Sequence, residues 1–396
     1  MSRLPRPIDL ASRRLGGGVM AANDEHFGKK ERLLDPSDPV SHAAHTGLTG
    51  DLYDGWETRR RRGPGDDWAL VRLGAAGIVR EIVVDTRHFR GQNPPSCTIE
   101  ACAVEGFPSA ESVLADDEVR WVPLVKQVPL LADDVNRLPV DSALRMTHVR
   151  LSIHPDGGVA RLRVLGDVVP DPRRLHGMTF DLAAQANGGR VVACSDEFFG
   201  NPTNINAPTP QLRKEKGWES NRRRSGGHDH LVIELAAKGV VGIIDYDTTY
   251  YTGNSPESFS LEGCDATASD LRDPDAWFSL LARTEGRHDT PHWFSALPAP
   301  AVTHVRLNIY PDGGVSRLRL WGRPDGTGRS HLAHRWFNSL PEDHAAAVLR
   351  NLDVPAGIAA RVVPGRPFPT PAETIAALRH ADDGPGVGKL LELFEV

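Results

Sequence analysis

Cysteine, aromatic side chains and long apolar runs are all scarce in this sequence of 396 residues. Its four cysteines form no CxxC pair and no zinc-ligand spacing, which argues against a disulfide framework and a structural zinc site. No run approaches the roughly 18 apolar residues of a membrane helix, and the N-terminus lacks the apolar segment of a secretory signal. These absences predict a cytoplasmic protein without a membrane partner.

An excess of basic residues is also missing. The sequence has 46 Lys and Arg against 52 Asp and Glu, which gives a net charge of -6 at pH 7. Without an overall positive field, no nucleic-acid partner is expected. Glycine (38 residues) and proline (31 residues) are frequent instead, and this favours short strands joined by tight turns.

One stretch of 20 residues occurs twice. Residues 147–166 read THVRLSIHPDGGVARLRVLG and residues 303–322 read THVRLNIYPDGGVSRLRLWG, with 15 identities. Apolar and polar residues alternate before the turn, as in a half-buried strand, and Pro-Asp-Gly-Gly suits a tight turn. Each copy is therefore predicted to form a β-hairpin.

Three further pairs of segments recur upstream in the same order, beginning at Ile8 and Phe180, at Gly55 and Gly217, and at Asp85 and Asp247. The distance between partners falls from 172 to 162 to 156 residues, so the first copy has insertions near 35–54 and between 102 and 147. Matched blocks of this length indicate a duplicated domain. Short alternating segments between turn signals predict an all-β fold of two tandem sandwiches.

We place the first repeat at residues 8–169 and the second at 180–324, with a proline-containing linker in which helix is disfavoured. Residues 335–396 instead have a helical pattern, including a capping box at 370–373. Short helices in so small a segment bury too little surface to be stable alone. The segment is therefore expected to pack on a sandwich or on another subunit.

Several of these motifs resemble those of the allantoicase family. They are GGGVMAANDEHFG, DGWETRRRR and HVRLxIxPDGGVxRLRxxG, and the resemblance covers roughly residues 8–324. It implies that each repeat is a jelly-roll sandwich similar to galactose-binding domains. It also implies hydrolysis of allantoate to ureidoglycolate and urea in purine (allantoin) degradation.

The helical tail resembles a second family. RWFNSLPEDHAAAVLR and GRPFPTPAETIAALRHA are similar to the start of OHCU decarboxylase, which acts earlier in the same pathway. The tail stops before the part that carries the catalytic histidine and glutamate of that family. We therefore expect no decarboxylase activity, and a packing role for the tail.

Hydrolysis of allantoate needs cations for its carboxylate, partners for its ureido groups, and a proton donor and acceptor. The repeated Trp-Glu-Arg blocks offer candidate substrate-binding residues: Glu57, Arg60, Arg61, Arg222 and Arg223. Glu57 suits either acid–base work or an ion pair with these arginines. The alternative for the whole block is a solvated, charged strand end.

Asp24 and Glu25, in a loop before an aromatic residue and glycine, are the first candidates for the catalytic base and the ureido acceptors. The alternative is a loop that caps a turn or binds a structural cation. Asp85 and His88 belong to another repeated block, and His88 is a candidate general acid. Its alternative role is to cap the loop.

The two copies differ at some of these positions. His26 corresponds to Phe198, His88 corresponds to Tyr250, and both insertions lie in the first copy. We therefore predict one active site per chain, dominated by the first repeat, with Asp24, Glu25, Arg61, Asp85 and His88 near one another.

Other polar residues have weaker support. His148 and His304 fit structural histidines on strands, whereas Arg161, Arg163, Arg317 and Arg319 suit either a basic groove for the substrate or a solvated face. The histidines at 42 and 45, and those at 228 and 230, lack a third ligand at fixed spacing. No cofactor is evident, and dependence on a divalent metal stays open.

Two further points stay open. One is whether the protein forms a homo-oligomer. The other is the alternative to an enzyme, namely a non-enzymatic tandem β-sandwich protein that only binds a small ligand. Sandwiches of this architecture often serve in that way, and the fold does not decide the function.

Overall fold

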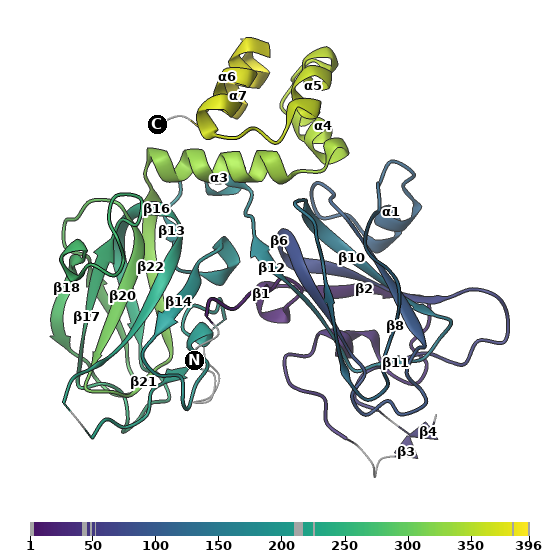
Figure 1. Ribbon diagram of the computed structural model, residues 1–396, viewed down its shortest axis with the longest axis horizontal. Helices are drawn as coiled ribbons and strands as arrows, with labels where there is room; N and C mark the ends of the chain where they lie inside the picture. Colours follow the sequence, from purple (N-terminus) through teal and green to yellow (C-terminus); the bar gives the residue numbers. More distant parts are fainter. Residues whose placement is uncertain are drawn as a thin grey trace.

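The computed structural model describes residues 4–41, 46–47, 50–51, 53–209, 217–224, 226–381 and 384–394. Figure 1 shows two β-sandwiches side by side, with a helical segment across one end of the pair. Every strand pairing in the described residues is antiparallel. The prediction of two tandem jelly-roll sandwiches followed by a short helical segment is confirmed.

The first repeat is organised around one long, bent strand, β6 (Asp67–Asp85). The other strands of its sheet are β1 (Ile8–Asp9), β2 (Gly18–Ala22), β7 (Ser96–Cys102), β8 (Val122–Pro129), β9 (Val135–Pro139), β10 (Arg145–His154) and β12 (Arg161–Val168). The first half of β6 pairs with β2 and β10, and its second half pairs with β9 and β12. The strand thus crosses from one layer of the sandwich to the other.

Both ends of β6 lie at the same end of the sandwich. The backbone N–H of Asp67 donates to the carbonyl of Pro155 at 3.0 Å, and that of Ala160 donates to the carbonyl of Asp85 at 2.8 Å. The same end holds the small ladder of β5 (Trp56–Glu57) with β11 (Gly158–Val159). The loops that carry the predicted site residues therefore gather at this end.

The second repeat has the same plan around β16 (Asp229–Asp247). Its other strands are β13 (Phe180–Asp181), β14 (Arg190–Cys194), β17 (Ser258–Cys264), β18 (Phe278–Glu285), β19 (Pro291–Ser295), β20 (Val302–Tyr310), β22 (Arg317–Pro324), and the ladder of β15 (Trp218–Glu219) with β21 (Gly314–Val315). The insertion of the first repeat also contains β3 (Thr46–Gly47) and β4 (Gly50–Asp51), which have no counterpart in the described residues of the second repeat.

The prediction of a hairpin in each copy is wrong, although its strands are present. β10 and β12 each pair with β6 and, in the described residues, not with each other. The Pro-Asp-Gly-Gly segment therefore connects the two layers of the sandwich. An alternating pattern followed by a turn signal shows which face of a strand is apolar, but it does not identify the neighbouring strand. Here the long strand β6 is a hydrogen-bonding neighbour of both segments.

Each repeat has its own apolar core. Trp56 and Trp218 are fully buried, and their indole N–H groups donate to the carbonyls of Asp24 and Asp196 at 2.7 and 2.8 Å. Cys102 and Cys264 are buried, as their alternation with inward residues predicted. The indole contacts anchor the loop that follows β2 and the loop that follows β14.

The tail consists of α3 (Gly326–Ser339), α4 (Glu342–Asn351), α5 (Ala356–Val362), α6 (Pro371–Ala381) and α7 (Pro385–Leu391). Its core includes Ile78 and Val169 of the first repeat. The tail therefore packs on a sandwich, which is one of the two arrangements expected from the sequence. The linker contains a single helical turn, α2 (Pro172–Leu175), contrary to prediction. Proline is tolerated there because it occupies the first helical turn.

The helices of the described residues include none that is long and apolar enough to span a membrane.

Candidate active site

Asp24 holds the loop in which it lies. Its Oδ1 accepts from the backbone N–H groups of His26 and Arg59 at 3.0 and 3.1 Å, and its Oδ2 accepts from Nε of Arg59 at 2.7 Å. Burial raises the pKa of Asp24, but these hydrogen bonds outweigh it and keep the pKa below its ordinary value. The side chain is therefore an ionised loop anchor, and its predicted catalytic role stays a prediction.

The neighbouring Glu25 accepts a hydrogen bond from the backbone N–H of Lys30 at 3.1 Å and forms an ion pair with its Nζ at 3.4 Å. Glu57 is buried in β5, where its backbone pairs with Gly158 and bridges to Gly28. Both positions are built into the loop end of the first repeat.

The predicted arginine anchors divide into two kinds. The backbone N–H groups of Arg61 and Arg223 donate to Asp156 and Asp312 at 2.8 and 2.7 Å. Their guanidinium groups face the aspartates that begin β6 and β16, with Nη–Oδ1 distances of 3.5 Å for Arg61 and 2.7 Å for Arg223. Arg60 and Arg222 are exposed.

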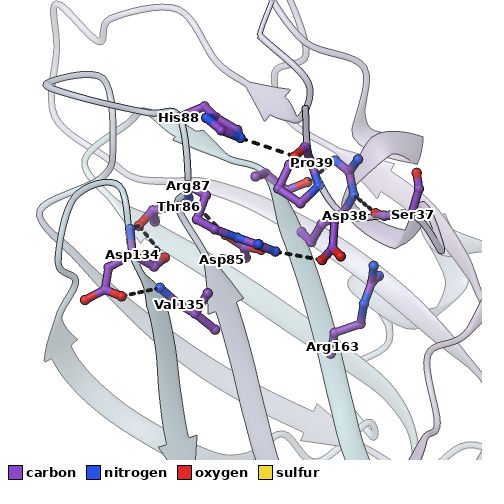
Figure 2. A network of polar contacts seen from close by, with 12 residues as sticks. Ser37, Asp38, Pro39, Asp85, Thr86, Arg87, His88, Asp134, Val135 and Arg163 are labelled. Carbon is purple, nitrogen blue, oxygen red and sulfur yellow. Dashed lines mark hydrogen bonds and ion pairs between the residues drawn. The ribbon is translucent and has the colours of Figure 1, made fainter. Parts of the chain in front are cut away.

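Asp85 and His88 belong to the polar network of Figure 2. Asp85 is buried and receives hydrogen bonds from the backbone and the guanidinium of Arg87, which also reaches Asp38 at 2.9 Å. His88 has a positive φ of 71°, and its Nε2 donates to the carbonyl of Pro39 at 3.2 Å. The insertion of the first repeat thus covers Asp85 and His88.

The predicted residues of the first repeat share one end of the sandwich without forming one cluster. In the described part of the chain, no hydrogen bond or ion pair joins Asp24 or Glu25 to Asp85 or His88. Arg222 and Arg223 lie at the equivalent end of the other repeat. The predicted histidine pair at positions 42 and 45 lies outside the described residues.

A polar cleft of about 470 Å³ lies instead between the two repeats. The first repeat contributes Arg6, Asp9, Ser12, Arg14 and Arg163, from the N-terminal segment, β1, η1 (Arg13–Leu15) and β12. The second repeat contributes polar side chains from η3 (Gln185–Asn187), β14 and η4 (Pro202–Asn204): Gln185, Arg190, Asn201, Thr203, Asn204 and Asn206. The volume of the cleft lies within the range of roughly 300–1,000 Å³ that is typical of small-molecule binding sites.

Four arginines, Arg6, Arg14, Arg163 and Arg190, reach the cleft from opposite walls, and three of them contact acidic or carbonyl partners as follows. Nη2 of Arg6 contacts Glu197 at 2.6 Å, and Nη2 of Arg190 contacts Glu234 at 2.7 Å. Arg163 donates to the carbonyl of Asp35 and stands 3.9 Å from Asp9. Several guanidinium groups around one cleft create a site for a small anion.

Asp9 is the carboxylate of this cleft. Its Oδ1 accepts from the backbone N–H groups of Val164 and Ala11 at 3.0 and 3.2 Å, and its Oδ2 is the atom nearest Arg163. Burial raises the pKa of Asp9, against the lowering effects of Arg163 and the two N–H groups. A fixed carboxylate with a raised pKa, beside a guanidinium, is suited to general acid–base work.

The second repeat contains a matched aspartate, Asp181, with the same backbone contacts. It accepts from the N–H groups of Leu320 and Ala183 at 2.9 and 3.0 Å. Asp181 is buried, whereas Asp9 is partly exposed and lines the cleft. The shared contacts are therefore structural, and access to the cleft is particular to Asp9.

Most of the residues that line the cleft were not predicted from the sequence. Arg163 was considered for a basic groove, but Asp9, Arg6, Arg14 and Arg190 were not. Asp9 occurs in the repeated Asp-Leu-Ala segment, which is a usable signal, whereas Arg14 and Arg190 correspond to Ala186 and Gly18 in the other copy. A cleft between two copies uses different faces of each, so internal repetition does not mark it.

Metal ligands do not gather in the described residues, where no group of three or more His, Cys, Asp or Glu side chains could hold an ion.

Comparison with known proteins gives one consistent result. A family model described as the allantoicase repeat matches residues 8–169 and 180–325. A probable allantoicase of Nocardia farcinica is 46% identical and covers 80% of this chain and 94% of the relative, and one of Streptomyces coelicolor is 44% identical with 83% and 88% covered. The crystal structure of allantoicase from Saccharomyces cerevisiae is similar with a TM-score of 0.67 at 33% identity, over 80% of this chain and 92% of that chain.

The match of the repeat model to both sandwiches, together with relatives of this identity over most of both chains, shows that the chain belongs to the allantoicase family.

Proposed function

We propose that this protein hydrolyses allantoate to ureidoglycolate and urea in purine degradation, and that the cleft between the repeats is the active site. Relatives named allantoicase, at 39–46% identity over most of the chain, support the reaction and disfavour the alternative of a protein that only binds a small ligand. The observation that supports the location is the set of four arginines around one partly exposed carboxylate among the described lining residues.

Arg163 and Arg14 are proposed to bind the allantoate carboxylate. A guanidinium can form two parallel hydrogen bonds with a carboxylate, which fixes the orientation as well as the charge. The opposite wall carries the amides of Gln185, Asn204 and Asn206, which provide both donors and acceptors for the two ureido groups. The central carbon would then lie between a cationic wall and an amide wall.

Asp9 is proposed to transfer the proton. During hydrolysis, water gives its oxygen to the central carbon and loses a proton, while the carbon–nitrogen bond to one ureido group breaks and that nitrogen gains a proton. A single carboxylate can accept the first proton and donate the second, so urea leaves neutral and Asp9 returns to its starting state. The raised pKa of Asp9 makes it a better proton acceptor than an ordinary aspartate.

The loop-end residues remain candidates beside this site. Asp24, Glu25, Asp85 and His88 stay predicted catalytic groups, and Glu57, Arg60, Arg61, Arg222 and Arg223 stay predicted substrate-binding residues. One indirect role is favoured by contact: Asp85 holds Arg87, Arg87 holds Asp38, and both acids contribute to the electrostatic environment of Arg163. The network of Figure 2 would then position one wall of the cleft.

The test is urea release by the purified protein, with allantoin as the control substrate. Wild-type protein should release urea from allantoate and not from allantoin. Arg163→Ala should raise the KM for allantoate by roughly tenfold to a hundredfold, because a charge-assisted contact is lost. Its matched variant, Arg319→Ala, should leave KM within a few-fold. No urea from wild-type protein would refute the reaction, and an unchanged KM for Arg163→Ala would refute the location.

A further inference from the structure

A second polar cavity, of about 270 Å³, lies where the first repeat, the linker and the helical tail meet. Its walls include Arg72, Arg145 and His148 of the sandwich, Arg174 of the linker, and His344 of α4. In the described residues it shares no lining residue with the cleft between the repeats. It is therefore a separate compartment from the proposed active site.

Three guanidinium groups of this cavity lack an acidic partner in the described part of the chain. Arg145 is 7% exposed and donates from Nε to the carbonyl of Val169 at 2.7 Å. Arg72 donates to the carbonyl of Gly16, and Arg174 stacks on the ring of Phe107. Buried or clustered cations without counter-charges favour a bound anion.

The two acids of the wall share a cation that does not line the cavity. Glu105 and Asp171 both receive hydrogen bonds from Nη2 of Arg173, at 3.0 and 2.6 Å. Glu105 also contacts Nε2 of His344 at 2.6 Å. These acids hold the linker and the tail in place and act on Arg145 from a distance, but in the described residues neither forms an ion pair with Arg72, Arg145 or Arg174, so the arginines of the cavity are in excess over its acids.

Two buried histidines add incomplete hydrogen bonding to the same walls. His148 is 2% exposed and His344 is 3% exposed. In the described residues, Nε2 of His148 and Nδ1 of His344 have no hydrogen-bond partner. Buried polar atoms are nearly always paired in folded proteins, so two orphan nitrogens beside one cavity point to a ligand-binding rather than a packing role.

The second repeat lacks this chemistry although it has the same fold. Glu234 stands in place of Arg72, opposite the equivalent histidine in the sheet register, and is paired with Arg190. Ala301 stands in place of Arg145. The tail, which supplies His344, lies outside the matched family repeats. The cavity is therefore a property of the first repeat and the tail together.

We propose that this cavity binds a small dicarboxylate, and that the bound anion fastens the helical tail to the first repeat. Three guanidinium groups can satisfy two carboxylates, whereas a neutral ligand of this size would leave their charges uncompensated. The occupant contacts the sandwich, the linker and α4 at once, so binding and tail docking are coupled. The site does not depend on the reaction catalysed in the other cleft.

The experiment is a calorimetric titration of the full-length protein with malonate, combined with hydrogen exchange of α4. Malonate should bind wild-type protein and slow exchange across residues 342–351. The double variant R72A/R174A should weaken the affinity by about tenfold or more. Both substituted side chains are partly or fully exposed, so this variant should fold.

His148→Ala should also weaken malonate binding, whereas its matched control in the second repeat, His304→Ala, should leave it unchanged. No malonate binding to wild-type protein, no slowing of exchange across residues 342–351, or unchanged affinity in R72A/R174A would each overturn the proposal. Urea release measured on the same variants is an independent readout, so failure of this site is distinguishable from failure of the proposed active site.

Discussion

The two repeats are alike where they hold their own fold and different where they face the rest of the molecule. Asp24 and Asp196 accept the same pair of backbone hydrogen bonds, at 3.0 and 3.1 Å in the first repeat and at 3.0 and 2.9 Å in the second. His88 and Tyr250 share a positive φ, of 71° and 70°, and each backbone N–H donates to an aspartate, Asp133 and Asp289. These backbone contacts, present in both copies, thus serve the structure of each repeat.

The differences lie at surfaces that only one copy uses. Arg14 and Arg190 line the cleft between the repeats, and their partners in the other copy are Ala186 and Gly18. Arg72 lines the cavity under the tail, where the second repeat has Glu234. Duplication gave two copies of one scaffold, and function is expected where their residues have diverged or where, as at Asp9 and Arg163, the residue of one copy faces the cleft and its match does not.

The largest expected effect separates the two matched aspartates. Asp9→Asn should lower kcat/KM for allantoate by about 10²–10⁴-fold, the usual contribution of a general acid–base group. Asp181→Asn removes the same backbone-anchored carboxylate from the second repeat and should change kcat/KM by less than about threefold. Urea release and thermal unfolding of both variants provide the comparison. Equal losses of activity at equal loss of stability would mean that Asp9 is structural only.

The acid limb of the pH–rate profile adds a second check on Asp9. Because burial raises its pKa above the ordinary 3.8, the base should become protonated, and the rate should fall, at a higher pH than an ordinary aspartate would give. This limb should be absent from the residual activity of Asp9→Asn.

An intermediate effect should separate the matched histidines. Burial, helped by Arg72, lowers the pKa of His148 from 6.5 to about 4, whereas at His304 burial lowers the pKa and Glu234 opposes it. The stabilisation from neutral His148 is present above pH 6.5 and is lost as pH falls toward 4, by about 3 kcal/mol in all. Denaturant unfolding should show that His148→Gln removes more of this pH dependence than His304→Gln. Equal slopes would contradict the asymmetry of their surroundings.

The smallest expected effect concerns the loop anchors. Asp24→Asn and Asp196→Asn should each lower the free energy of unfolding by about 1 kcal/mol, because each weakens two charge-assisted backbone hydrogen bonds of similar length. Urea release should stay within a few-fold of wild type in both. A heavy loss of activity from Asp24→Asn alone would instead support the predicted active site at the loop end.

Much of the fold could be predicted because a strand or helix with one buried face has apolar residues at regular intervals in the sequence. Alternation in the segments 147–153 and 303–309 identified buried strands, and the capping box at Thr370 identified α6, where Thr370 accepts from the N–H of Glu373 at 3.2 Å. The pairing of β10 with β6 was missed because register partners lie far apart in sequence. The helix α3 was expected from 335 and begins at Gly326, capped by Asp325.

The site was harder to predict for a related reason. Internal repetition selects residues that both copies need, and it selected Asp24, Asp85 and the arginine blocks, all of which hold loops. Arg6, Arg14 and Arg190 act, in our account, only because two different surfaces meet. That meeting depends on tertiary packing, which a single sequence does not reveal.

The central claim is that substrate binds between the repeats, and hydrogen exchange with an unreactive ureido acid tests it most directly. Hydantoate carries one carboxylate and one ureido group on a single carbon and has no second ureido group to lose. At saturation it should slow exchange in residues 8–15 and 185–207, on the two walls of the cleft. Slower exchange confined to residues 24–28, 57–62 and 85–90 would contradict the account and place the substrate at the end of the first sandwich.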